Sequence, residues 1–260
     1  MAACLAGDLP TLMSLLSSFR NPQGDQDATI FRLLAEATNM RHKALVEYLL
    51  EQTENTDYPE DLIWSAIVAG YDIYMLYLVK NPAIWKYEWY GLGNVVCMAL
   101  TQNNVEILTY LLETIGADPG RSLESSRKGD MFLPLEWAAY SSTESNAQLL
   151  LKHGAIINGT NALQLAAGYG RLGMVRLLVE AGADVNAMLD SNDMFHGNQD
   201  GSQGTALHYA AQRGAKDVVE YLISKGADTR KLDRSGYTAR GRANIKGHDE
   251  IVRLIRSHET

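Results

Sequence analysis

The chain has 260 residues, 46% of them hydrophobic and 21% charged, and 23 Lys+Arg against 31 Asp+Glu give a formal net charge of −8. This composition is typical of a globular protein and excludes wholesale disorder. The acidic balance, the lack of a basic cluster and the lack of an apolar run of roughly 18 residues argue against nucleic acid or membrane as the main partner. With no signal-like N-terminus and only Cys4 and Cys97, we expect a cytoplasmic or nuclear protein.

The first half of the chain contains weak copies of a two-helix pattern, in which a small residue is followed by an apolar ladder. The small residues are Gly7, Gly70 and Asn103, and Arg41 takes the same place within residues 30–50. Apolar residues that recur every three to four positions predict an amphipathic helix after each of them.

Aromatic residues concentrate in residues 58–90, which hold nine of the chain's 21 Phe, Trp and Tyr. Tyr74 and Tyr77 fall on a predicted second helix, where packing is the favoured interpretation. Four rings fall instead in a connecting hairpin, where large rings gain little unless they cover something. We therefore predict that the hairpin binds a ligand or partner through Trp85, Tyr87, Trp89 and Tyr90.

The second half of the chain repeats one unit more clearly. Copies occur at residues 133–155, 161–184, 204–228 and 237–257. Thr205 and Thr238 are 33 residues apart, as are Gly214 and Gly247, and such a period is typical of stacked repeats. The copy at 204–228 predicts a short helix, a left-handed stop at Gly214 and a second amphipathic helix. One unit cannot bury its own apolar face, so stacking supplies the core.

The spacing between copies breaks at two insertions, which are expected to form loops at the rim of the stack. The longer one, between Asp184 and Thr205, contains Asp190, Asp193, His196 and Asp200. Oxygen and imidazole ligands occur together there, but the spacing fits no calcium loop. We favour a flexible acidic rim and predict no metal site.

The pattern resembles the ankyrin-repeat family, because T-A-L-H-Y-A-A at 205–211 is close to that family's T-P-L-H-x-A signature. The resemblance is clearest over residues 133–257 and weaker over 1–130. It implies an all-α solenoid of seven to eight helix–turn–helix repeats with hairpin loops and truncated capping repeats. A single domain over 1–260 is expected, with repeats near 1–26, 27–58, 59–90, 91–130, 131–159, 160–203, 204–235 and 236–260.

The histidine position of the signature holds different residues along the chain. His208 occupies it in the clearest copy, where the family uses the ring to brace the hairpin by hydrogen bonds. Glu136 occupies it in residues 133–155. We expect Glu136 to take over the bracing, and the alternative is a carboxyl of raised pKa that acts as a general acid or base.

The first helices also offer a column of aromatic residues. Their phasing predicts that one concave surface is lined by Trp137, Tyr140, Tyr169, Tyr209 and Arg213. Rigid aromatic side chains with a few polar groups are typical of interface hot spots and of apolar ligand pockets.

Two functions of different classes follow from these features. The favoured one is a non-enzymatic scaffold or adaptor that binds another protein, one with basic patches, on its concave face and loop fingers. The alternative is a small-molecule binder or a cofactor-independent isomerase or cyclase for an aromatic or polyphenolic substrate, with Glu136, His208 and Tyr140 as candidate catalytic residues. No motif of a hydrolase, a metalloprotease or a nucleotide-binding loop occurs. We expect no cofactor and a monomer.

Overall fold

The computed structural model describes residues 8–18, 26–54, 56–81, 95–120, 133–188 and 203–259. Within them the regular structure is helical, and the extended pairing consists of one isolated antiparallel bridge between Leu232 and Thr238. The predicted all-α repeat fold is therefore confirmed. Among these ranges, no helix has the length and hydropathy that a bilayer crossing requires.

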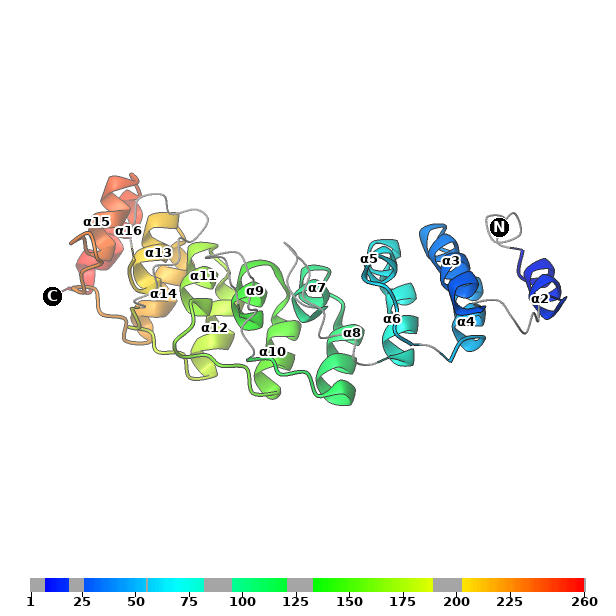
Figure 1. Cartoon of the computed structure of the whole chain (residues 1–260). Coiled ribbons are helices and arrows are strands. Elements are labelled where there is room, and N and C mark those ends of the chain that lie inside the picture. The colour runs from blue at the N-terminus through cyan, green and yellow to red at the C-terminus, as the bar shows by residue number, and fades with distance from the viewer. Residues whose placement is uncertain are drawn as a thin grey trace. The chain divides into compact units, whose positions relative to one another are not determined.

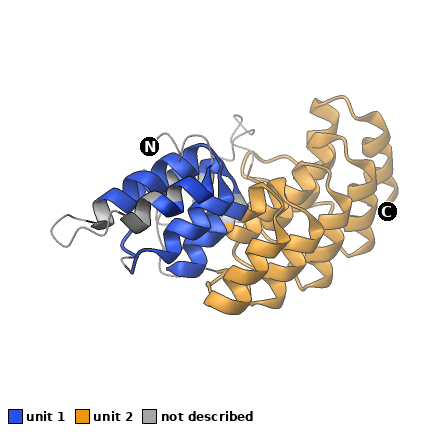
Figure 2. Cartoon of the chain, turned by 90° about the vertical axis from the view of Figure 1, so that its right-hand side faces the viewer, with its two compact units in different colours: residues 1–87 blue, residues 88–260 orange. Residues whose placement is uncertain are grey.

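The chain separates into two compact units, unit 1 at Met1–Tyr87 and unit 2 at Glu88–Thr260 (Figure 2). The single domain over residues 1–260 and the repeat boundaries stay predictions. The helices of unit 1 are α2 (Leu9–Ser18), α3 (Gln26–Asn39), α4 (Lys43–Glu51), α5 (Glu60–Ala69) and α6 (Tyr71–Lys80). Helix α3 packs on α4 and α5, and α6 packs on α5 and α4, so two helix pairs are stacked side by side.

Three tyrosines form the centre of unit 1. Tyr58, Tyr74 and Tyr77 are each 2% exposed or less, which confirms the packing interpretation of Tyr74 and Tyr77. The Tyr58 ring lies edge-on to the Tyr77 ring at 5.2 Å, and the Tyr77 hydroxyl is 2.7 Å from Oγ1 of Thr38. Burial raises the pKa of Tyr58 to about 12 and also raises the pKa of Tyr77. These rings are core and not binding surface.

Unit 2 consists of two parallel rows of helices (Figure 1). We call the first helices of its repeats the first-helix row: α7 (Val95–Thr101), α9 (Pro134–Ser141), α11 (Ala162–Gly168), α13 (Ala206–Arg213) and α15 (Ala239–Ile245). The second-helix row comprises α8 (Val105–Thr109) with its π-helical continuation η2 (Tyr110–Ile115), α10 (Glu144–Lys152), α12 (Leu172–Glu180), α14 (Lys216–Ser224) and α16 (Asp249–Ser257). Along each row every helix packs on the next, as a stacked repeat requires.

Small residues let the first helices approach one another closely. Paired or single alanines that are fully buried stand at the same place in successive first helices, at Ala138, Ala139, Ala166, Ala167, Ala210, Ala211 and Ala243. The second helices supply the larger apolar side chains of the core, and Leu150, Leu178 and Leu222 are fully buried. The predicted amphipathic pattern of each repeat therefore faces the neighbouring repeats.

In most repeats that the structure describes, the turn between the two helices uses a residue with positive φ. Gly214 has a φ of 86° and Gly247 a φ of 76°, as the sequence predicts for glycine stops. Arg41 and Asn103, which stand where glycine is usual, adopt the same conformation with φ values of 56° and 54°. Left-handed turns therefore occur at Arg41 and Asn103 although these residues have a Cβ atom, whereas the turn between α9 and α10 does without one, since Ser142 and Thr143 have φ values of −104° and −83°.

Candidate binding surface

Glu136 braces two backbone segments from the start of α9. One carboxylate oxygen accepts a hydrogen bond from the backbone N–H of Leu133 at 2.8 Å, which caps its own helix. The other accepts from the backbone N–H of Asn161 at 2.6 Å, in the hairpin that leads into α11. The side chain is 6% exposed. Glu136 therefore links two repeats, as the bracing interpretation expects.

His208 makes the equivalent contacts from α13, but towards the next hairpin it donates a hydrogen bond where Glu136 accepts one. Its Nδ1 lies 3.1 Å from the backbone nitrogen of Thr205, and its Nε2 lies 3.1 Å from the carbonyl oxygen of Tyr237 in the next hairpin. Because Nδ1 accepts from an N–H, Nε2 carries the proton and donates to the carbonyl. Burial lowers the pKa of His208, which favours this neutral ring. The imidazole is thus fixed as a structural link.

Gln164 completes this column of braces in α11. Its side-chain amide donates to the carbonyl oxygen of Ala187 at 3.2 Å, and the residue is 3% exposed. The same position thus holds the following hairpin through a carboxylate, an amide or an imidazole, at Glu136, Gln164 and His208. For the acid–base alternative at Glu136 and His208, these contacts offer no support, since the polar atoms already bind backbone groups.

A second type of brace links the start of α12 to the end of α9, the first helix of the preceding repeat. Nη1 of Arg171, at the N-cap of α12, donates to the carbonyls of Ala138 at 2.8 Å and Ala139 at 2.9 Å, and Nη2 donates to the carbonyl of Ser142. Burial is the main cause that lowers the pKa of Arg171. The guanidinium thus adds a second donor to the Ala138 carbonyl, which already accepts from the backbone N–H of Ser142 at 3.0 Å, and it also binds the two carbonyls of Ala139 and Ser142 at the end of α9.

Three of the predicted surface residues form a continuous row of rings. The Trp137 ring lies edge-on to Tyr140 with centroids 5.9 Å apart, and Tyr140 lies edge-on to Tyr169 at 4.9 Å. The indole N–H of Trp137 donates to Oγ1 of Thr101 at 2.8 Å, which ties the row to α7. Tyr140 and Tyr169 are 38% and 43% exposed. We call Trp137, Tyr140 and Tyr169 the aromatic row.

The two remaining predicted residues lie on α13, next to the aromatic row. Tyr209 packs against α11, where a Cβ atom added to Gly168 would lie 3.5 Å from the Cβ of Tyr209. Partial burial raises the pKa of Tyr169, Tyr140 adds to the rise, and Arg213 opposes it, so the Arg213 guanidinium acts electrostatically on Tyr169. The described part of the prediction therefore comes together on one face of three successive first helices.

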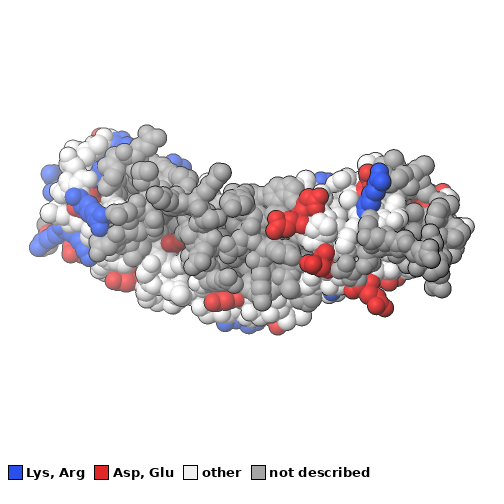
Figure 3. Space-filling model, viewed as in Figure 1, with Lys and Arg blue, Asp and Glu red and all other residues white. Residues whose placement is uncertain are grey.

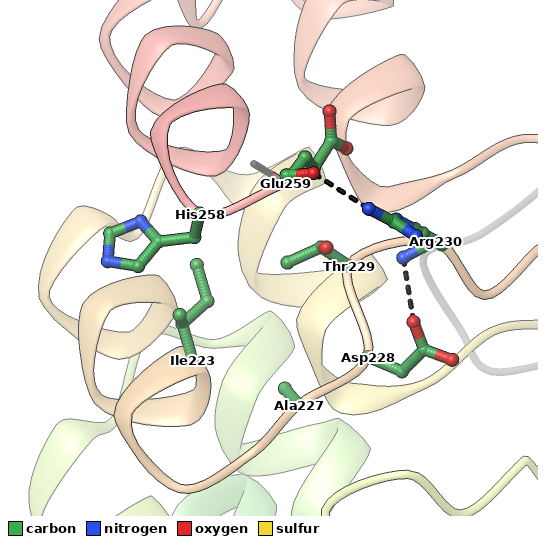
Figure 4. A pocket seen from close by; sticks show the side chains of 7 residues that line it. All are labelled: Ile223, Ala227, Asp228, Thr229, Arg230, His258 and Glu259. Atoms are coloured by element: carbon green, nitrogen blue, oxygen red, sulfur yellow. Dashed lines mark hydrogen bonds between the residues drawn. The ribbon is translucent and has the colours of Figure 1, made fainter.

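A hollow of about 510 Å³ lies elsewhere, between the end of α14 and the end of α16 (Figure 4). Arg230 crosses it, donating from Nη2 to the carbonyl of Glu259 at 2.8 Å and from its backbone N–H to Oδ1 of Asp228 at 2.9 Å. None of the predicted binding residues lines this hollow. It therefore gives no support to an aromatic ligand pocket.

Several predicted features lie outside the described residues. The hairpin rings Trp85, Tyr87, Trp89 and Tyr90 are among them, and so is the acidic stretch from Asp190 to Asp200. In the ranges that the structure does describe, no group of three or more His, Cys, Asp or Glu is arranged to hold a metal ion.

Sequence reasoning missed a buried ion pair in the last hairpin. Nε of Arg242 donates to Oδ2 of Asp233 at 2.5 Å, and Oδ1 of Asp233 accepts from the backbone N–H groups of Ser235 and Tyr237. The Arg242 guanidinium also lies over the Tyr237 ring at 4.9 Å. An Asp-x-Ser-Gly turn at 233–236 followed by an arginine on the next helix was the available signal.

Comparison with known proteins agrees with this architecture. A family model described as ankyrin repeats, in three copies, matches residues 96–189 and 188–260. Ankyrin repeat and SAM domain-containing protein 6 is 32% identical over 164 residues in rat and 35% identical over 138 residues in mouse, covering 62% and 52% of this chain. Bovine ankyrin repeat and SOCS box protein 3 is 27% identical over 177 residues, or 56% of this chain. The matches cover 17%, 14% and 32% of these relatives' own lengths.

Proposed function

Because the chain belongs to the ankyrin-repeat family, we propose that it is a protein-interaction module whose partner binds the exposed face of the first-helix row of unit 2. The single observation that carries this proposal is the aromatic row. Its rings cross two successive repeats in mutual edge-to-face contact while Tyr140 and Tyr169 stay more than a third exposed. Exposed aromatic side chains in a fixed arrangement are typical of interface hot spots.

The braces support the proposal because they make the face rigid before a partner arrives. Trp137 is held by Thr101, and the carboxylate of Glu136 on the same helix fixes α9 to the hairpin before α11. A surface that is already ordered loses little conformational freedom on binding, so more of the contact energy contributes to affinity. The hairpin loops at the rim are proposed to add contacts, as fingers beside the first-helix row.

The small-molecule alternative has no specific observation in its favour. The polar atoms of its candidate catalytic residues Glu136 and His208 bind backbone groups, and Tyr140 is 38% exposed with its ring against Tyr169. The monomeric state and the cytoplasmic or nuclear location stay predictions.

The proposal is tested by quantitative affinity capture from the native lysate with two matched double variants. Tyr140→Ala with Tyr169→Ala removes the exposed rings, and Gln148→Ala with Glu180→Ala changes two exposed residues of α10 and α12 on the second-helix row. Circular dichroism and thermal unfolding establish that both variants are folded. We expect proteins that the unmodified chain and the second-helix variant retain to be lost from the aromatic variant. Equal retention by all three would contradict the proposal.

A further inference from the structure

Carboxylates in unit 2 are divided unequally between its two rows of helices. The second-helix row carries eight of them, Glu106, Glu113, Glu144, Glu180, Asp217, Glu220, Asp249 and Glu250. The first-helix row carries one, Glu136, which is buried and accepts from two backbone N–H groups. The described helices of the first-helix row therefore expose no carboxylate on their accessible surface.

Charge is also divided unequally along the chain. Residues 203–259 contain 11 Lys+Arg and 7 Asp+Glu, so their net charge is 11 − 7 = +4, while the rest of the chain has 12 − 24 = −12. Blue side chains accordingly gather at the end of the molecule that holds α15 and α16 (Figure 3). The net charge of −8 is therefore the sum of two parts of opposite sign.

Arg213 places one of these cations beside the aromatic row. It is the last residue of α13, it is exposed, and it acts electrostatically on Tyr169. Among the residues that the structure describes, no carboxylate lies within salt-bridge distance of Arg213. Its charge is thus available to a partner, whereas Arg240 on α15 is paired with Glu259.

Local charge decides which partner this face accepts. The Debye length is about 8 Å at physiological ionic strength, so a charge that lies farther than this from the aromatic row acts on it only weakly. A guanidinium binds a carboxylate through two parallel hydrogen bonds, which makes Arg213 a suitable partner for an acidic side chain. A lysine or arginine of a partner would instead meet the like charge of Arg213.

We propose that the aromatic row and Arg213 together bind an acidic segment of a partner protein, with an apolar side chain against Tyr140 and Tyr169 and a carboxylate on Arg213. This inference rests on the proposed function and specifies its partner. It replaces the expectation, drawn from the net charge of the whole chain, of a partner with basic patches.

The test is selection from a displayed library of random peptides on the full chain, followed by affinity measurements on the selected peptides by fluorescence anisotropy. We expect peptides enriched in Asp and Glu next to aromatic or aliphatic residues. Tyr140→Ala is expected to weaken their binding about 30-fold, as for an interface hot spot. Arg213→Gln is expected to weaken it about fivefold, the upper end for an exposed ion pair. The control Arg253→Gln removes an exposed cation from α16 on the second-helix row and is expected to leave binding unchanged.

The outcomes separate this inference from the proposed function. Binding to the unmodified chain is expected to weaken as salt rises, and Arg213→Gln is expected to reduce that dependence on salt. Basic or uncharged peptides that still require Tyr140 would overturn the acidic partner and leave the proposed function standing. Peptides that bind equally to the unmodified chain and to Tyr140→Ala would overturn both.

Discussion

Exchanging the bracing residues of two repeats tests whether hydrogen-bond polarity holds the stack together. Glu136 accepts from two backbone N–H groups, whereas His208 accepts from one and donates to the carbonyl of Tyr237. In Glu136→His the ring has only one acceptor nitrogen, so it can bind the N–H of Leu133 or that of Asn161 but not both. In His208→Glu the carboxylate oxygen faces a carbonyl oxygen, and no donor joins them.

The size of the effect follows from the bond that is lost. A hydrogen bond to a charged group contributes about 1.5–3 kcal/mol, and a buried N–H left without a partner costs a similar amount. We therefore expect Glu136→His to lower the local free energy of opening by about 3 kcal/mol, even though histidine is the residue of the family signature. His208→Glu is expected to lower it at least as much, because it adds repulsion between acceptors.

Native-state hydrogen exchange is the assay, because repeat arrays need not unfold in two states. In Glu136→His, the amide of Leu133 or of Asn161 is expected to exchange about 100-fold faster, while amides of α16 change little. Glu180→Gln, at an exposed carboxylate of α12, is the control and is expected to stay within about 0.5 kcal/mol. Unchanged exchange at both amides in Glu136→His would refute the reasoning.

Three further predictions concern the other supports of the stack. Arg41→Gly is expected to stabilise the chain by up to about 1 kcal/mol in thermal unfolding, since it removes left-handed strain at φ 56° and loses only an exposed hydrogen bond of 3.3 Å from Nη2 of Arg41 to the Val68 carbonyl. Asn103→Gly is expected to destabilise it, because Oδ1 of Asn103 accepts from Oγ of Ser142 at 3.0 Å and from the backbone N–H of Thr143 at 3.1 Å. Arg171→Lys is expected to cost about 1–3 kcal/mol in urea unfolding, because an ammonium cannot reproduce the fork on three carbonyls. Burial lowers the pKa of His208, so the unfolded chain takes up the proton first; stability measured by urea unfolding is expected to fall as the pH drops below about 6.5, and less so in His208→Gln.

The repeat architecture was predictable because its signals are local and periodic. The apolar spacing gave the helix pairs, and the position of Arg41 and Asn103 in that spacing located left-handed turns without glycine. The burial of Tyr74 and Tyr77 followed from the same phase. Each of these conclusions needs only the order of residues within one repeat.

Contacts between repeats were harder to predict, because one sequence does not show which backbone group faces a side chain. The sequence indicated that Glu136 replaces a histidine, but not that it faces the N–H of Asn161 rather than a carbonyl. Nothing in the spacing showed that Arg171 reaches back to the end of α9. The uneven division of carboxylates became visible only when each helix was assigned to a row, because the net charge of the whole chain does not show how charge is distributed over the two rows.

Site-specific photo-crosslinking tests most directly the central claim that the partner binds the first-helix row of unit 2. A photoreactive phenylalanine replaces Ser141, which is exposed at the end of α9 beside the aromatic row, or Gln148, which is exposed on α10 of the same repeat. We predict discrete crosslinked products from position 141 in the native lysate and none of comparable yield from position 148. Crosslinks that form as efficiently from position 148, or from there alone, would contradict the account.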